Sequence, residues 1–231
     1  PENVNSEQVI EELEKLSPDV IVVVAFGQKI SDKILNLPKH KCVNIHASLL
    51  PKYRGAAPIN WAVVNGEKET GITTIIMSNK MDAGDVIIRK SLTIGPEETA
   101  GELGNRLSRL GAETLLDSLT QIETGDAKYT QQDESLVSLA PKIKKTDGLI
   151  DWNQEEEKIH NFVRGMNPKP AAYTFLTRNN SKERIIILKT ERDNSSHNET
   201  DIAPGTIMDI SSQGIRAATG SGSIWIKEVK P

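Results

Sequence analysis

Two polar side chains lie close together at the end of an apolar run, in the stretch KCVNIHAS at residues 41–48. Asn44 and His46 are separated by one residue, so on a β-strand both side chains point to the same face. A strand that ends there places them at its carboxyl end, where open α/β sheets hold their ligands. An asparagine amide can stabilise an oxyanion, and a histidine can transfer a proton near neutral pH. The pair therefore indicates acid–base or oxyanion chemistry.

A carboxylate partner for this pair is available in the turn MDAGD, at residues 81–85. A carboxylate beside a histidine orients the ring and favours its charged form. With Asn44 and His46, either Asp82 or Asp85 would complete an acyl-transfer site that lacks a protein nucleophile. Physical argument treats the two carboxylates alike. The same residues also suit structural roles, as a buried histidine, a loop cap and an Asp-Gly turn.

Other chemistries lack their signatures in this sequence. Neither phosphate-binding motif, GxxxxGK[ST] or GxGxxG, is present, and the serine-hydrolase motif GxSxG is also absent. No Cys/His cluster has zinc spacing, so we expect no metal. Cys42 lies in a β-branched context, which favours a buried structural thiol over a nucleophile.

Composition narrows the class of protein further. The 231 residues include 28 basic and 32 acidic side chains, which argues against a surface devoted entirely to nucleic acid. The single cysteine excludes an intramolecular disulfide and suits a reducing compartment. No apolar stretch approaches the roughly 18 residues of a membrane span, and the first residues do not resemble a leader. We therefore expect a cytoplasmic protein that does not bind membranes.

The first part of the chain reads as an α/β domain. Helical spacing at residues 6–16 is followed by a β-branched run, residues 20–27, that we expect to be buried on both faces. A short helix and the Asn44–His46 strand complete a β-α-β unit, which predicts parallel strands. Further elements are predicted as helices at 59–66 and 99–125 and strands at 71–77 and 86–94.

The second part of the chain has a different pattern of polar and apolar residues. Residues 128–147 are polar and lack a strong period, which is typical of a linker. A helix at 155–166 precedes short strands that suggest a small β-barrel or sandwich, at 184–191, 205–211, 214–220 and 223–229. The polar segments 179–183 and 191–201 are predicted loops. We therefore predict a catalytic domain at 1–127, a linker at 128–147 and a β domain at 148–231.

The net charge also differs between the first and second parts of the chain. Residues 1–140 hold 14 basic and 20 acidic side chains, a net charge of −6, whereas residues 141–231 hold 14 and 12, a net charge of +2. The less acidic second part suits an accessory surface that faces a polyanion, although chance variation in composition accounts for it equally well.

The string NIHASLLPKYRGAAPINWAVVNGEKETGITTIIM, followed by MDAGDVI, closely resembles the folate-dependent formyltransferases. The family pattern is an Asn-x-His pair leading into SLLPxxRG, with the Asp of a D-x-G-D loop some 36 residues after the His, and Asp82 has that spacing from His46. Within the family, the chain is most similar to the members that formylate methionyl initiator tRNA. The resemblance extends over the whole chain, through LAPKIKKTDGLIDW, NPKPAAYT, APGTI and GIRAATGSG.

The resemblance implies a fold and a site. The fold is α/β, a doubly wound, mostly parallel, Rossmann-like sheet with a smaller OB-like β-barrel domain. The implied reaction transfers a formyl group from 10-formyltetrahydrofolate to the α-amine of methionyl initiator tRNA. Asn44, His46 and Asp82 are the implied catalytic residues. The implied folate site is the turn formed by Ser48, Leu49, Leu50 and Pro51.

The resemblance also implies that relatives begin with about two further β-α units, roughly 60 residues, and that the chain lacks this N-terminal segment. We expect a monomer whose partners are folate and tRNA. Glycinamide-ribonucleotide formyltransferase shares the Asn-x-His and SLLP motifs but has no second domain of this kind. Sugar-nucleotide N-formyltransferases and formyltetrahydrofolate hydrolases or dehydrogenases remain alternatives, as does a catalytically silent tRNA-binding relative.

Overall fold

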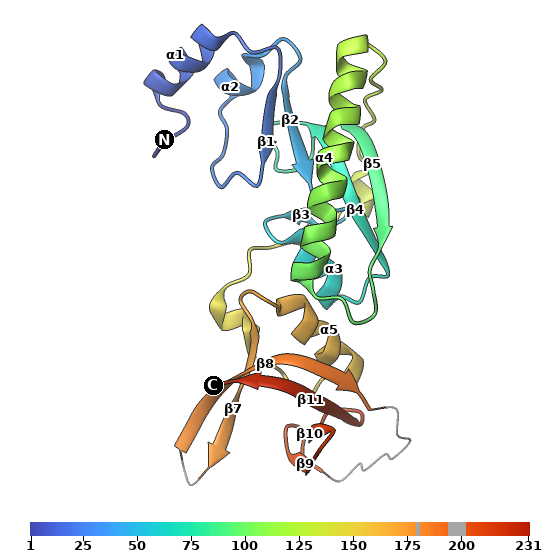
Figure 1. The fold of residues 1–231 in the computed structure, drawn as a ribbon. Helices are drawn as coiled ribbons and strands as arrows, with labels where there is room; N and C mark the ends of the chain where they lie inside the picture. The colour runs from blue at the N-terminus through green and yellow to red at the C-terminus, as the bar shows by residue number, and fades with distance from the viewer. Residues whose placement is uncertain (179–180, 194–201) are drawn as a thin grey trace. The chain divides into compact units, whose positions relative to one another are not determined.

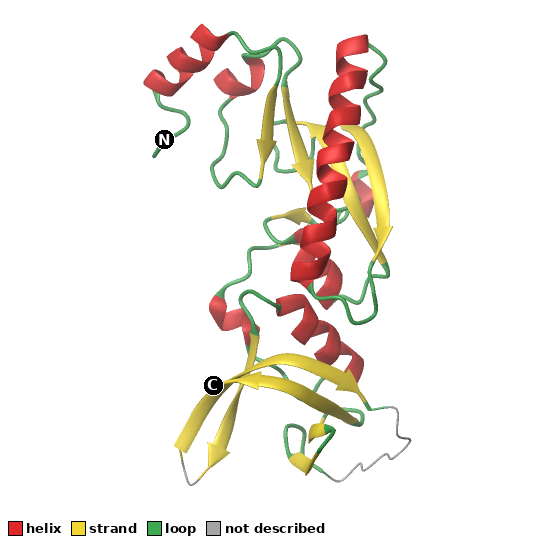
Figure 2. Ribbon diagram, in the orientation of Figure 1, coloured by secondary structure: helices red, strands yellow, loops and turns green. Residues whose placement is uncertain are grey.

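The computed structural model describes residues 1–178, 181–193 and 202–231 and divides them into two compact units. The first unit consists of Pro1–Pro58, Glu69–Thr93 and Asn105–Pro141, and the second of Ile59–Lys68, Ile94–Gly104 and Lys142–Pro231. Figures 1 and 2 show the helices and strands of each unit. No helix in the described part of the chain has the length and hydropathy of a membrane span.

The first unit is built on a sheet of four strands in the order β1-β2-β4-β5. They are β1 (Ile21–Val24), β2 (Cys42–His46), β4 (Glu69–Ile76) and β5 (Val86–Thr93). The predicted β-α-β unit is confirmed, because β1 and β2 pair in parallel and α2 (Asp32–Asn36) connects them.

The other two pairings, β2 with β4 and β4 with β5, are antiparallel, so the sheet is mixed, whereas we expected it to be mostly parallel. The connection from β4 to β5 explains part of the difference. Residues 77–85 contain no helix, and a strand that returns without a crossover element pairs antiparallel.

Helices cover both faces of this sheet, as a doubly wound fold requires. Cys42 packs with residues of α1 (Glu7–Leu16) and α2 in one apolar cluster. Its neighbour Val43 packs with Ile122 of α4 (Ala100–Thr124) in another cluster. Because successive residues of a strand point to opposite faces, α1 and α2 lie on one face and α4 on the other. Figure 1 shows this arrangement around β1 and β2.

Strand β1 differs from the prediction of burial on both faces. Its side chains alternate between half-buried and exposed, and Val24 is 57% exposed. The reason lies in the topology, because β1 is the terminal strand of the described sheet.

The segment 128–147 contains regular structure that the sequence pattern did not predict. A 3₁₀ turn, η1 (Glu134–Leu136), precedes β6 (Leu139–Ala140), and β6 pairs in parallel with β3 (Arg54–Gly55). Thr130 also forms a bridge to Val86 at the start of β5. Up to Pro141 this segment therefore belongs to the first compact unit.

The second unit contains a five-stranded antiparallel sheet in the order β7-β8-β11-β10-β9. Helix α5 (Glu156–Met166) packs Ile159, Val163 and Met166 into an apolar cluster with this sheet. The strands are β7 (Ala172–Arg178), β8 (Ser181–Arg192), β9 (Ile207–Ser211), β10 (Gly214–Ala218) and β11 (Ser223–Lys230). The unit also contains η2 (Lys145–Gly148), the start of α4 and most of α3 (Pro58–Val64).

An antiparallel β domain is confirmed in this second unit, and β7 is a strand that the sequence pattern missed. Strand β8 begins at Ser181 and ends at Arg192, so residues 181–183 and 191–192 are strand and not loop. The rest of the predicted loops includes residues 179–180 and 194–201, which lie outside the described residues.

Candidate active site

Strand β2 places Asn44 and His46 as the sequence pattern predicts. Asn44 pairs with Val23 on the parallel side and with Ile75 on the antiparallel side, and His46 is the last residue of the strand. The imidazole of His46 is buried, and the Asn44 side chain is half-buried. Two polar groups thus lie at the carboxyl end of an interior strand.

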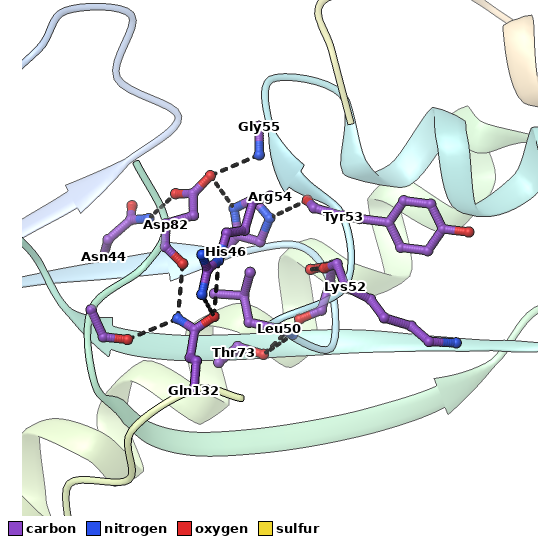
Figure 3. Close-up of polar contacts among 12 residues, drawn as sticks. Asn44, His46, Leu50, Lys52, Tyr53, Arg54, Gly55, Thr73, Asp82 and Gln132 are labelled. Atoms are coloured by element: carbon purple, nitrogen blue, oxygen red, sulfur yellow. Dashed lines mark hydrogen bonds and ion pairs between the residues drawn. The ribbon is translucent and has the colours of Figure 1, made fainter. Parts of the chain in front are cut away.

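The carboxylate of Asp82 lies between these two side chains and a backbone amide (Figure 3). Its Oδ2 is 3.6 Å from Nδ1 of His46 and accepts a 2.9 Å hydrogen bond from the Gly55 N–H. Its Oδ1 is 3.5 Å from Nδ2 of Asn44, at the long end for a hydrogen bond. The side chain of Asp82 is 13% exposed, whereas Asp85 is exposed to solvent. Geometry therefore separates two carboxylates that physical argument from the sequence left equivalent and agrees with the choice of Asp82 that the resemblance implied.

The second ring nitrogen of His46 is also held. Nε2 lies 2.8 Å from the carbonyl oxygen of Tyr53, and because a carbonyl only accepts, Nε2 carries a proton. Nδ1 faces the Asp82 carboxylate, so a proton there would also face an acceptor. The ring is oriented from both sides and can hold a proton on the edge that faces Asp82.

The turn after β2 is held by Thr73 of β4. The Thr73 hydroxyl donates to the Ser48 carbonyl at 2.6 Å and accepts from the Leu50 N–H at 3.1 Å. The Ser48 hydroxyl in turn donates to the Lys52 carbonyl at 2.6 Å. Ser48, Leu50 and Pro51 are buried, and Leu49 is half-buried. The turn is thus rigid, and Leu49 has the most accessible side chain of its four residues.

Cys42 lies on the same strand as Asn44 and His46 and was predicted to be structural. The thiol is fully buried, and burial raises its pKa from 9.0 to about 11. Because the thiolate is the nucleophilic form, Cys42 is unsuited to covalent catalysis near neutral pH. The prediction of a structural thiol is confirmed.

Sequence reasoning missed three groups that hold the site: the Tyr53 carbonyl, the Gly55 N–H and the side-chain amide of Gln132. The Gln132 amide donates to the carbonyls of Asp82 and Gly84. Two of the three are backbone groups, which leave no signal in the pattern of side chains. Gln132 lies in the segment that was interpreted as a linker, and no feature of that segment distinguishes it from the adjacent Gln131.

Together these groups suit acyl transfer to an amine. An amide donor and an oriented imidazole lie side by side at a strand end, with a carboxylate behind them that can balance positive charge on the ring. A family model described as "Formyl transferase" matches residues 1–119, and one described as "Formyl transferase, C-terminal domain" matches residues 142–231.

The chain belongs to the formyltransferase family. A relative from Geobacter metallireducens with the name methionyl-tRNA formyltransferase is 46% identical over 230 residues, covering 100% of this chain and 71% of the relative. A protein of the same name from Clostridioides difficile is 42% identical, covering 100% of this chain and 72% of its own length.

Two solved structures share the fold of this chain. HypX from Aquifex aeolicus, in complex with tetrahydrofolic acid, has a TM-score of 0.70 at 22% identity, over 96% of this chain and 37% of HypX. WlaRD, a sugar 3N-formyl transferase whose structure was determined in the presence of dTDP and 5-N-formyl-THF, has a TM-score of 0.69 at 22% identity, over 92% of this chain and 74% of its own. At this identity the two structures support the fold alone.

Proposed function

We propose that this formyltransferase transfers the formyl group of 10-formyltetrahydrofolate to the α-amino group of methionine esterified to initiator tRNA. The observation that carries the proposal is the 46% identity, over the whole chain, to a relative with the name methionyl-tRNA formyltransferase. The arrangement of Asn44, His46 and Asp82 supports it, because it supplies the groups that such a reaction needs.

In this reaction the methionyl amine attacks the formyl carbon, and a tetrahedral intermediate with an oxyanion forms. Asn44 donates a hydrogen bond to the oxyanion, and His46 stabilises the same charge and helps to move the proton that the amine loses. For this proton transfer one ring nitrogen exchanges its contact with Tyr53 or Asp82 for a contact with the substrate. The bond from the formyl carbon to N10 of the folate then breaks, and N10 receives a proton. The products are formylmethionyl-tRNA and tetrahydrofolate. Asp82 orients His46 and balances its charge.

The folate donor is assigned to the turn formed by Ser48, Leu49, Leu50 and Pro51. The side chains of Ser48 and Leu50 are buried, and Thr73 already holds the Ser48 carbonyl and the Leu50 N–H. Contacts to folate would therefore come from the remaining backbone groups of the turn and from the Leu49 side chain. The rigidity of the turn suits this role, since a preformed site pays little entropy when the donor binds.

The proposal also includes domain boundaries, a location and an oligomeric state. We place the catalytic domain at residues 1–127, a connecting segment at 128–147 and the OB-like domain at 148–231. The connecting segment packs with the first compact unit as far as Pro141. The OB-like domain would supply part of the tRNA surface, and the enzyme would act in the cytoplasm as a monomer without a metal.

A formyl-transfer assay tests the proposal directly. The protein is incubated with methionyl initiator tRNA, with and without 10-formyltetrahydrofolate, and formylmethionine is measured after hydrolysis of the ester. We expect formylation only when the donor is present. An amino-sugar nucleotide serves as a competing acceptor, because solved relatives include sugar formyl transferases. Formylation of the sugar, with none of the tRNA, would contradict the proposed acceptor.

A further inference from the structure

The side-chain amide of Gln132 uses every hydrogen-bonding position it has. Nε2 donates to the carbonyl oxygens of Asp82 and Gly84, both at 2.8 Å. Oε1 accepts from Nε and Nη2 of Arg54, at 3.1 Å and 2.8 Å. The residue is only 5% exposed. A buried amide with two donors and two acceptor positions filled is a rigid connection, and its loss would leave buried partners unsatisfied.

The two carbonyls that Gln132 holds belong to the turn that carries the Asp82 carboxylate. Asp82 has φ of +51°, a backbone conformation that residues other than glycine adopt uncommonly. A Cβ atom at Gly84 would overlap the carbonyl oxygen of Ile76, so this part of the turn lies directly against β4. A backbone in this conformation persists only when neighbouring groups fix it, and Gln132 is one of those groups.

Gln132 also connects this turn to the loop that holds the other side of the site. Its partner Arg54 is flanked by Tyr53, whose carbonyl accepts from His46, and by Gly55, whose N–H donates to Asp82. The guanidinium of Arg54 is fixed further by Glu134, at 2.8 Å and 3.2 Å. Figure 3 shows Gln132 below Asp82 and His46, with contacts to both segments.

The rest of the 130–140 segment reinforces this connection. The Ser138 hydroxyl accepts a hydrogen bond from the Tyr53 N–H at 2.9 Å, and the Ser138 carbonyl accepts one from the Arg54 N–H at 2.9 Å. Ala140 pairs with Gly55, which has φ of +129° and no room for a side chain against the Ala140 carbonyl. The segment therefore runs along both loops that orient His46 and Asp82.

We propose that Gln132 is a positioning residue for the formyl transfer, because it fixes the distance between the Asp82 carboxylate and the His46 ring. It acts through the two loops and not through substrate. The inference rests on the proposed function for its kinetic consequences, but its structural consequence can be measured without any substrate.

The test compares three variants of adjacent glutamines. Gln132→Met keeps the length of the side chain and removes all four hydrogen bonds. Gln132→Glu keeps the acceptor for Arg54 and replaces the amide donor with oxygen, so it isolates the contacts to the turn. Gln131→Met is the matched control, because Gln131 is exposed. Native folding of each variant is checked by protection of the buried Cys42 thiol.

We expect both Gln132 variants to lower kcat by about 10-fold to 100-fold, since a displacement of about 1 Å in a catalytic group can cost that much. KM for the folate donor should stay close to wild type, because the turn at 48–51 is held by Thr73. Hydrogen exchange of the Gly55 amide, which donates to Asp82, should be at least about tenfold faster in both variants. Gln131→Met should leave all three quantities unchanged.

Wild-type kcat in either Gln132 variant would overturn the proposal. Loss of kcat with unchanged exchange at Gly55 would also overturn it, because Gln132 would then act by another route. If activity falls only in proportion to the fraction of folded protein, Gln132 contributes to folding and not to the position of the catalytic groups, and the proposal is contradicted. If Gln132→Met fails to fold, Gln132→Glu decides. If the wild-type protein transfers no formyl group, the proposed function fails, and exchange at Gly55 still decides whether Gln132 holds the site.

Discussion

Asp82 and Asp85 share one turn, yet their surroundings differ. The Asp82 carboxylate faces Asn44, His46 and the Gly55 N–H, whereas the Asp85 side chain is exposed. We predict that Asp82→Asn lowers kcat by about 100-fold, roughly 2.7 kcal/mol, because it removes the charge that balances the ring while keeping an acceptor for Gly55.

Asp85→Asn is the matched control for that substitution. It should leave kcat within about threefold of wild type, as is usual for a surface substitution away from the reacting groups. Steady-state kinetics with saturating folate donor measure both variants. A larger loss in Asp85→Asn than in Asp82→Asn would contradict the assignment of Asp82.

At the scale of single residues, the sequence predicted those parts of the candidate site whose arrangement depends on local geometry. Asn44 and His46 were predictable because side chains two apart on a strand share a face. The choice of Asp82 over Asp85 came only from the resemblance, since it depends on how the turn folds back. Gln132 was missed because it lies 50 residues along the chain from Asp82, and contacts at that separation leave no periodic pattern. The Tyr53 carbonyl was missed because a backbone group leaves no signal in the pattern of side chains.

Strand β2 carries the candidate site, and Cys42 at its start is fully buried, so its thiol reports on how the strand is packed. Raising the thiol pKa from 9.0 to about 11 lowers the thiolate fraction near neutral pH by about 100-fold. We predict that a thiol-specific reagent at pH 8 modifies the native protein at least about 100-fold more slowly than the urea-unfolded chain. Rapid modification without denaturant would show that β2 is not held as described.

Helix α5 carries a buried titratable group, His160. Its Nδ1 is 3.1 Å from the Thr190 hydroxyl, and its Nε2 is 3.3 Å from the Pro96 carbonyl and 3.5 Å from the Glu97 carboxylate. Burial lowers the pKa of His160 below 6.5, with Glu97 opposing the shift and Arg164 and Arg192 adding to it. Protonation of His160 is therefore less favourable in the folded protein than in the unfolded chain.

The sign of the pH dependence follows from that difference. The contribution of neutral His160 to the free energy of unfolding is complete above pH 6.5. It is lost as the pH falls below that value, because the unfolded chain then binds more protons than the folded protein. We predict that the free energy of unfolding of His160→Gln, measured with urea, changes less between pH 7.5 and pH 5 than that of wild type. Equal slopes for wild type and His160→Gln would contradict the prediction.

At the scale of elements, periodicity predicted helices and the parallel β1–β2 pair, whereas pairing direction and exposure depended on topology. The β-branched run of β1 looked buried on both faces, but its place at the end of the sheet leaves Val22 and Val24 exposed. The pattern missed β7, which follows Pro168 and Pro170, because a proline-rich approach is typical of a turn.

Across the whole molecule, charge suggests where tRNA phosphates would be contacted. Residues 141–231 have a net charge of +2, and Lys142, Lys144 and Lys145 are exposed within four positions. We predict that replacing all three with glutamine weakens tRNA binding and flattens its dependence on salt. Each lost phosphate contact should reduce the slope of log K against log salt by roughly 0.7 to 0.9.

The matched control replaces three exposed lysines of the first unit, Lys29, Lys33 and Lys39, with glutamine. It changes net charge equally and should leave the slope at its wild-type value. Equal slopes for the two triple variants and wild type would place the phosphate contacts elsewhere.

The central claim, that His46 acts in the formyl-transfer step, is tested most directly by single-turnover formylation of methionyl initiator tRNA by His46→Ala. His40→Ala is the control, because it removes a histidine that has no contact to Asn44 or Asp82 in the described structure. We predict that the rate constant of the chemical step falls by about 100-fold or more in His46→Ala and stays at wild type in His40→Ala. Affinity for the folate donor should change little in either. A wild-type rate constant for folded His46→Ala would contradict the claim.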